Sequence, residues 1–322
     1  VRAGRRVRRT CRLPRRPHAL REHAQHRQPR AHENRQRDQQ LQEQRTAPHD
    51  SISAPRPRSS RTIAIATAKG GVGKTNLAVN LAVTLARRGL RVVLIDADLG
   101  TANVDVVLNV QTQYDLSDVV HGRKSIVDVA TPLEDGLYLI RGASGLSAVA
   151  DLEEDDRHRL IEQLALLERH SDFILIDCGA GISQNVLAFA QAADELLIVT
   201  TPEPTALTDA YALIKVLTRH GLPPSMNLVV NQVASLHEGQ MVADRVGGVA
   251  ARLLVVALGG WGHILRDDHV GMAVRQRVPF ATRFPRSPAA NCVAALAVRI
   301  AAGSTPGPDR PGFFRRALGF FC

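Results

Sequence analysis

Two lysines, three glycines and a threonine share the seven residues from Lys69 to Thr75, which read K-G-G-V-G-K-T. The glycines let backbone N–H groups curl around a phosphate at the start of a helix, where the helix dipole favours negative charge. Lys74 can then reach the terminal phosphates of a nucleotide, and the Thr75 hydroxyl can coordinate Mg²⁺. The stretch predicts a phosphate-binding loop whose contacts come from Gly70, Gly71, Val72, Gly73, Lys74, Thr75 and Asn76.

The segments on either side of this loop have the patterns that it requires. An apolar run at 62–67 predicts a strand, and a helical pattern covers 74–88. Ala68 stands where the general pattern has its first glycine. The chain has only four lysines, at 69, 74, 124 and 215, so two in one loop favour a functional role over an incidental glycine-rich turn.

A candidate metal-binding carboxylate, Asp177, ends the apolar run at 173–177. A carboxylate at the end of a buried strand can hold Mg²⁺ through water in a phosphate-binding site. The small residue Gly179 follows, and it would let the backbone approach a terminal phosphate. A helix cap is the alternative role for Asp177, but the nearby phosphate loop favours the metal role.

From Arg61 onward, short β-type runs alternate with amphipathic stretches of helical length. This alternation predicts a doubly wound, mostly parallel α/β sheet with helices on both faces. We expect strands at 62–67, 91–95, 137–140, 173–177, 196–200 and 227–231. We expect helices at 74–88, 155–170, 184–192, 205–220, 238–253 and 288–302. Ligands of such sheets bind at the carboxyl ends of the strands.

Charge and composition divide the 322 residues into three predicted regions. Residues 1–60 hold sixteen arginines against five acidic residues and little apolar periodicity, so we expect a disordered extension. The net charge of +10 therefore belongs to this extension and not to the α/β domain predicted at 61–302. Nucleic-acid binding by the extension is possible but not favoured. The four cysteines form no C-x-x-C pair, and no apolar stretch is long enough to span a membrane.

The third region, 303–322, combines a Pro/Gly-rich linker with an apolar and basic tail. In a helix, Phe314, Ala317, Leu318 and Phe321 fall on one face, and Arg315 and Arg316 are free to meet anionic lipid headgroups. We predict a membrane-targeting tail formed by Phe313, Phe314, Arg315, Arg316, Leu318, Phe320 and Phe321. The alternative is a tail that packs on its own domain.

The loop with its extra lysine resembles the deviant Walker A box of the MinD/ParA ATPases. Further stretches at 98–105, 142–145, 176–183, 200–205 and 208–215 resemble the FlhG (FleN/YlxH) flagellar number regulators within that group. The resemblance implies a slow, regulatory ATPase that uses ATP and Mg²⁺. It also implies that Lys69 crosses to the nucleotide of a partner subunit, so that two ATP molecules lie between the subunits of a homodimer.

The resemblance assigns roles to two further residues. Asp98 would position the attacking water and complete the magnesium site with Thr75 and Asp177, a role that suits phosphoryl transfer because positioning dominates that chemistry. The amide of Asn231 would contact the adenine edge. A capped loop for Asp98 and a strand-end turn for Asn231 are the alternatives.

The resemblance further implies a cytoplasmic protein that associates peripherally with the inner face of the cell membrane. Its implied partners are an FlhF-type GTPase and flagellar switch or regulator proteins. An N-terminal motif that stimulates this GTPase in many members is matched only in part at 38–45.

Two other functions stay open on the sequence. One is a ParA-like partition or MinD-like division-site ATPase, and the other is a nucleotide-bound scaffold that scarcely hydrolyses ATP.

Overall fold

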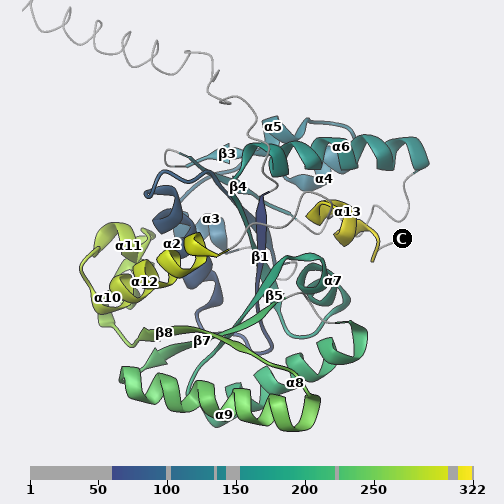
Figure 1. Cartoon of the computed structure of the whole chain (residues 1–322). Coiled ribbons are helices and arrows are strands. Elements are labelled where there is room, and N and C mark those ends of the chain that lie inside the picture. Colours follow the sequence, from purple (N-terminus) through teal and green to yellow (C-terminus); the bar gives the residue numbers. More distant parts are fainter. Residues whose placement is uncertain are drawn as a thin grey trace, which may run out of the picture. The chain divides into compact units, whose positions relative to one another are not determined.

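A central sheet of eight strands organises the computed structural model (Figure 1). The structure describes residues 60–98, 103–133, 136–142, 153–221, 225–303 and 311–320, all within the compact unit Ser53–Cys322. The predicted extension at 1–60 lies outside this range, apart from Ser60. The strand order is β3-β4-β2-β5-β1-β6-β7-β8, and every neighbouring pair is parallel except β3 with β4.

The strands are β1 (Arg61–Thr67), β2 (Val92–Ala97), β3 (Thr131–Pro132), β4 (Leu137–Ile140), β5 (Phe173–Ala180), β6 (Glu195–Thr200), β7 (Met226–Val233) and β8 (Gly259–Leu265). The helices are α2 (Lys74–Ala86), α3 (Val104–Leu108), α4 (Leu116–Val120), α5 (Ile126–Val129), α6 (Glu154–His170), α7 (Gln184–Ala192), α8 (Pro204–His220), α9 (Leu236–Leu254), α10 (Asp268–Gln276), α11 (Phe280–Arg283), α12 (Pro288–Ala302) and α13 (Phe313–Leu318). The predicted α/β sheet is confirmed.

Helices cover both faces of the sheet because its central strands are apolar on both sides. In β1, Ile63 and Ile65 join the hydrophobic cluster beneath α2 and α12, whereas Ala64 and Ala66 join the cluster beneath α6 to α9 and α13. This alternation follows from the two-residue period of a strand. It places the phosphate loop, which follows β1, at the carboxyl end of the most central part of the sheet.

The sequence analysis did not predict β8, which pairs with β7. Its sequence, G-G-W-G-H-I-L, contains three glycines, and glycine weakens the β-type pattern on which strand prediction depends. Asp267 follows β8 and caps α10, accepting a hydrogen bond from the His269 N–H at 3.0 Å. The strand therefore brings residues 266–275 to the same edge of the sheet as the phosphate loop.

The tail forms the short helix α13, which packs against α6 and α7 (Figure 1). Phe313, Phe314, Ala317 and Leu318 are buried there, and the Phe313 ring lies 6.4 Å from that of Phe189. The tail thus packs on its own domain in this structure, which is the alternative weighed against an exposed membrane-facing tail. Among the described residues, no helix is long and apolar enough to cross a membrane.

Polar contacts hold both ends of α13 and change the expectation for Arg316. The Glu168 carboxylate accepts a hydrogen bond from the Phe314 N–H at 3.0 Å. Arg316 donates to the Ala192 carbonyl and to the Asp194 carboxylate, both at 2.7 Å. The prediction that Arg316 is free to meet lipid was wrong for this conformation, whereas Arg315 and Phe320 are exposed. Phe321 lies outside the described residues.

Candidate nucleotide-binding site

Two glycines of the phosphate loop adopt backbone conformations that side chains disfavour. Gly71 has φ 82° and Gly73 has φ 86°, both in the left-handed region. Gly73 is also the N-cap of α2, and a Cβ at this position would lie 2.5 Å from the side-chain amide of Asn231. The loop therefore turns tightly into α2, and the backbone N–H groups at the start of this helix form the place where a phosphate would bind.

Lys74 and Asp177 form a buried ion pair at the centre of the site. Lys74 Nζ lies 2.5 Å from Asp177 Oδ1, and the two side chains are 6% and 1% exposed. Burial raises the pKa of the Asp177 carboxyl, against the lowering effect of the Lys74 charge and of a hydrogen bond from Thr75. Lys74 is thus held at the floor of the loop, where it can turn to bound phosphates.

The residues around Asp177 suit a magnesium ion. Asp177 Oδ2 is buried without a hydrogen-bond partner in the described part of the chain. The Thr75 hydroxyl lies within hydrogen-bond reach of the same carboxylate. Carboxylate and hydroxyl oxygens are the hard ligands that Mg²⁺ takes, so Thr75 and Asp177 would hold it beside the phosphates, where it neutralises negative charge.

Asp98 lies beside Gly179, at the end of β5. A Cβ built on Gly179 would be 3.6 Å from Asp98 Oδ1, and the Asp98 charge raises the pKa of Asp177. The structure therefore brings Asp98, Asp177 and Gly179 together, as the sequence predicted. The water-positioning role of Asp98 stays a prediction.

Asp96 holds the backbone on both sides of the segment that begins with Asp98. Its carboxylate accepts hydrogen bonds from the backbone N–H groups of Asp98 at 3.2 Å and Val104 at 3.3 Å. Burial is the main cause that raises the pKa of Asp96 to about 6. These contacts give Asp96 a structural role, because they hold the backbone of Asp98 and the first residue of α3.

Asn231 contacts the phosphate loop itself in this structure. Its Nδ2 donates to the Val72 carbonyl at 2.7 Å, and its Oδ1 accepts from the Gln232 N–H at 2.9 Å. Gln232 has φ 59°, a left-handed conformation that is uncommon for a residue with a side chain. Asn231 is therefore close to the predicted ligand, but its adenine contact stays a prediction.

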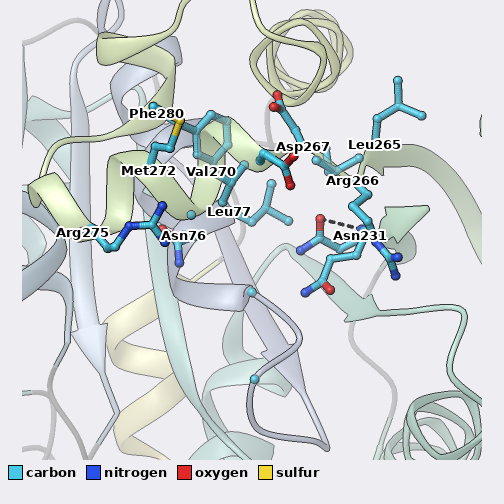
Figure 2. A pocket seen from close by; sticks show the side chains of 16 residues that line it. Asn76, Leu77, Asn231, Leu265, Arg266, Asp267, Val270, Met272, Arg275 and Phe280 are labelled. Atoms are coloured by element: carbon cyan, nitrogen blue, oxygen red, sulfur yellow. Dashed lines mark hydrogen bonds between the residues drawn. The ribbon is translucent and has the colours of Figure 1, made fainter. Parts of the chain in front are cut away.

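A cavity of about 590 Å³ extends from the phosphate loop toward the end of β8 (Figure 2). In Figure 2, Arg275 lies beside Asn76 at one end, and Arg266 lies beside Asn231 at the other. Apolar side chains form the wall between them, namely Leu77, Val270, Met272 and Phe280. Since phosphates bind at the loop, this cavity is the space available to the nucleoside. Sequence reasoning missed Arg266 and Arg275 because they follow the unpredicted strand β8 and belong to no motif.

Lys69 points away from the centre of the site and contacts the start of α8. Its Nζ donates to Glu203 Oε2 at 2.7 Å and to Thr205 Oγ1 at 2.8 Å. The two lysines of the loop therefore form different ion pairs. Lys74 pairs with the buried Asp177, and Lys69 pairs with the exposed Glu203.

Comparisons with known proteins agree with this geometry. The family model described as an AAA domain matches residues 60–222. The chain is 39% identical over 262 residues to the antiactivator FleN of Pseudomonas aeruginosa, which covers 81% of this chain and 91% of that protein. It is 37% identical over 195 residues to the flagellum site-determining protein YlxH of Helicobacter pylori, covering 60% and 65% of the two chains.

A solved structure shows the same fold with a nucleotide. MinD from Pyrococcus horikoshii, complexed with Mg-ADP, is 25% identical and superposes with a TM-score of 0.60 over 76% of this chain and 96% of that one. ATP with Mg²⁺ is the ligand of this ATPase family. The chain is therefore a member of the MinD/ParA-type P-loop ATPases and is similar, within them, to the antiactivator FleN and the flagellum site-determining protein YlxH.

Proposed function

We propose that the chain is an ATP-dependent, dimerising switch that regulates flagellar number and placement through reversible binding to the membrane and to partner proteins. The name of the similar YlxH, a flagellum site-determining protein, supports the flagellar role, and the name of the antiactivator FleN supports a regulatory one. The proposed partners are an FlhF-type GTPase and flagellar switch or regulator proteins. The proposed location is the cytoplasm and the inner face of the cell membrane.

The observation that carries the switch is the packed tail. Three of the apolar side chains that would enter a lipid surface, Phe313, Phe314 and Leu318, are buried in α13, which packs against α6 and α7. Arg316 is paired with Asp194. Apolar groups buried in the chain cannot also be buried in lipid, so membrane binding requires release of α13. One short helix binds lipid weakly, and a dimer that presents two such helices binds far more strongly.

The phosphate site would supply the ATP dependence. Lys74 and the loop N–H groups would bind the phosphates, and Thr75 and Asp177 would hold Mg²⁺ beside them. Asp98 would orient the attacking water, and Lys69 would contact the nucleotide of the partner subunit. Turnover should be slow, since a switch needs an ATP-bound state that lasts.

Co-sedimentation with anionic vesicles tests this proposal. The intact chain, a chain ending at Gly303 and the Lys69→Ala variant would each be compared in ATP and in ADP. We expect ATP to bring only the intact chain onto the vesicles. If all three stay in solution with either nucleotide, the membrane switch is wrong.

The similarity to MinD favours a second candidate, a partition or division-site ATPase. Counting flagella after deletion of the gene separates the two, because only the flagellar regulator should change their number. DNA binding by residues 1–60 would instead give an affinity that falls steeply with salt. A scaffold that scarcely hydrolyses ATP would be unaffected by Asp98→Ala, which the switch proposal expects to abolish turnover.

A further inference from the structure

The contacts of Lys69 within its own chain compete with a contact to a second chain. Its ammonium group has three N–H donors, and two of them are used by Glu203 and Thr205. We propose that Glu203 and Thr205 are positioning residues that hold Lys69 in the single chain, and that pairing of two chains must open this Lys69 clasp. The inference rests on the proposed ATP-dependent dimer.

The backbone of the clasp is fixed on both sides, so opening it requires only side-chain movement. Thr67 Oγ1 accepts from the Lys69 N–H at 3.3 Å and donates to the Lys69 carbonyl at 3.2 Å. On the other side, Pro204 occupies the first turn of α8, where its fixed φ suits the helix. The Lys69 side chain therefore bridges the end of β1 and the start of α8.

Glu203 stands at the N-cap of α8 but forms no side-chain cap. An acidic side chain at the start of a helix is favoured by the helix dipole and can accept from the N–H groups of the first turn. Here the Glu203 carboxylate instead binds Lys69, and the hydrogen bond from Lys69, together with its charge, lowers the pKa of Glu203. The side chain is thus positioned for the lysine and not for its own helix.

Exposure makes the clasp easy to open. The Lys69 and Glu203 side chains are 34% and 64% exposed, in contrast to the buried Lys74–Asp177 pair of the same loop. Exposed ion pairs are weak because water competes for both charges. The partner's nucleotide phosphates can therefore replace Glu203 as the anion that Lys69 contacts.

Glu203 would keep a cationic neighbour after Lys69 leaves. Arg266 lies close enough for its charge to lower the pKa of Glu203, and it also lines the nucleoside cavity. The freed carboxylate would thus remain next to a positive charge at the rim of the same site. The clasp thus opposes dimerisation, because its contacts must be broken before two chains can pair.

Lysine reactivity measures the clasp directly, without dimerisation. Dilute protein in Mg-ADP would be trace-labelled with acetic anhydride, and Lys69 compared with Lys124 and Lys215, two of the four lysines in the chain. Glu203→Gln and Thr205→Val should each raise the relative labelling of Lys69 about two- to five-fold, the range set by an exposed pair. Asp156→Asn, which removes the exposed Arg159 pair on α6, should leave it unchanged.

Sedimentation velocity with Mg-ATP tests the consequence for pairing. Each dimer opens two clasps, so Glu203→Gln should tighten the ATP-dependent dimer by about the square of that factor, roughly four- to 25-fold, and Lys69→Ala should prevent its formation. Two outcomes overturn the clasp alone. In one, the wild type dimerises but Glu203→Gln pairs no more tightly; in the other, labelling of Lys69 is unchanged in both variants. A wild type that stays monomeric in ATP overturns the proposed function, and the clasp's role in pairing falls with it.

Discussion

The phosphate loop and the tail helix hold their working side chains in opposite ways. Lys74 and Asp177 form a pair buried in the sheet, with exposures of 6% and 1%. The tail helix α13 lies on the surface of α6 and α7, held by buried phenylalanines and by the Arg316–Asp194 pair at its edge. The first pair lies inside the sheet, whereas the contacts of α13 lie outside it, so the proposed switch requires only the second set of contacts to separate. The comparison indicates that a switch exchanges contacts on the surface of the domain and not contacts inside the sheet.

Removing the buried lysine should have the largest effect. Lys74→Ala leaves the Asp177 carboxylate buried without its cation, which costs about 3–5 kcal/mol of folding free energy. Urea unfolding measures this loss, and titration with a fluorescent ATP analogue should show binding weakened by about 100-fold or more, as expected for a lost phosphate contact.

The double variant Lys74→Ala/Asp177→Asn is the control for this prediction. It should regain most of the stability, because no unpaired charge remains, but not the nucleotide binding. If the wild type and Lys74→Ala have the same free energy of unfolding, the buried pair does not contribute to the stability of the fold.

A smaller change at Gly312 should release the tail and spare the sheet. A Cβ at Gly312 would meet the Glu168 carboxylate, so Gly312→Ala should displace this group from the Phe314 N–H and weaken docking by about 1 kcal/mol through overpacking. Hydrogen exchange of residues 313–318 should become faster, and nucleotide-independent vesicle binding should increase.

Shortening the opposing side chain provides the rescue. Glu168→Ala combined with Gly312→Ala removes the clash and should restore part of the protection. Fast exchange in the sheet strands as well would contradict the independence of tail and core.

Acidity should produce the smallest effect. Burial raises the pKa of Glu168 above its ordinary value, Asp194 adds to the rise, and the Phe314 and Phe313 N–H groups and Arg316 oppose it. The docked state therefore holds a proton more tightly than the released state, so docking weakens as pH rises from 4.5 through the docked pKa. Hydrogen exchange of α13, corrected for its intrinsic pH dependence, should show this slope, and Glu168→Gln should abolish it.

The sequence predicted the parts of the molecule that follow a repeated pattern. β4, α7 and α12 have the predicted bounds, and the phosphate loop lies between the predicted strand and helix. β8 was not predicted because glycine has a low strand propensity. Arg266 and Arg275 follow this strand and were therefore not predicted either. The docking of α13 could not be predicted, since an apolar helical face is satisfied equally well by lipid and by a groove on its own chain. The partners of Asn231 and Lys69 depend on distances between elements, which no local pattern contains.

Asp194 determines what remains when the tail departs. One of its oxygens, Oδ1, accepts from Arg316, and the other, Oδ2, accepts from the Thr62 N–H at 2.9 Å and the Thr62 hydroxyl at 2.8 Å. Departure of α13 would therefore take Arg316 from Oδ1 and leave Oδ2 hydrogen-bonded to β1. In the proposed switch, β1 would thus keep the Asp194 carboxylate in place, ready to receive Arg316 when the tail returns.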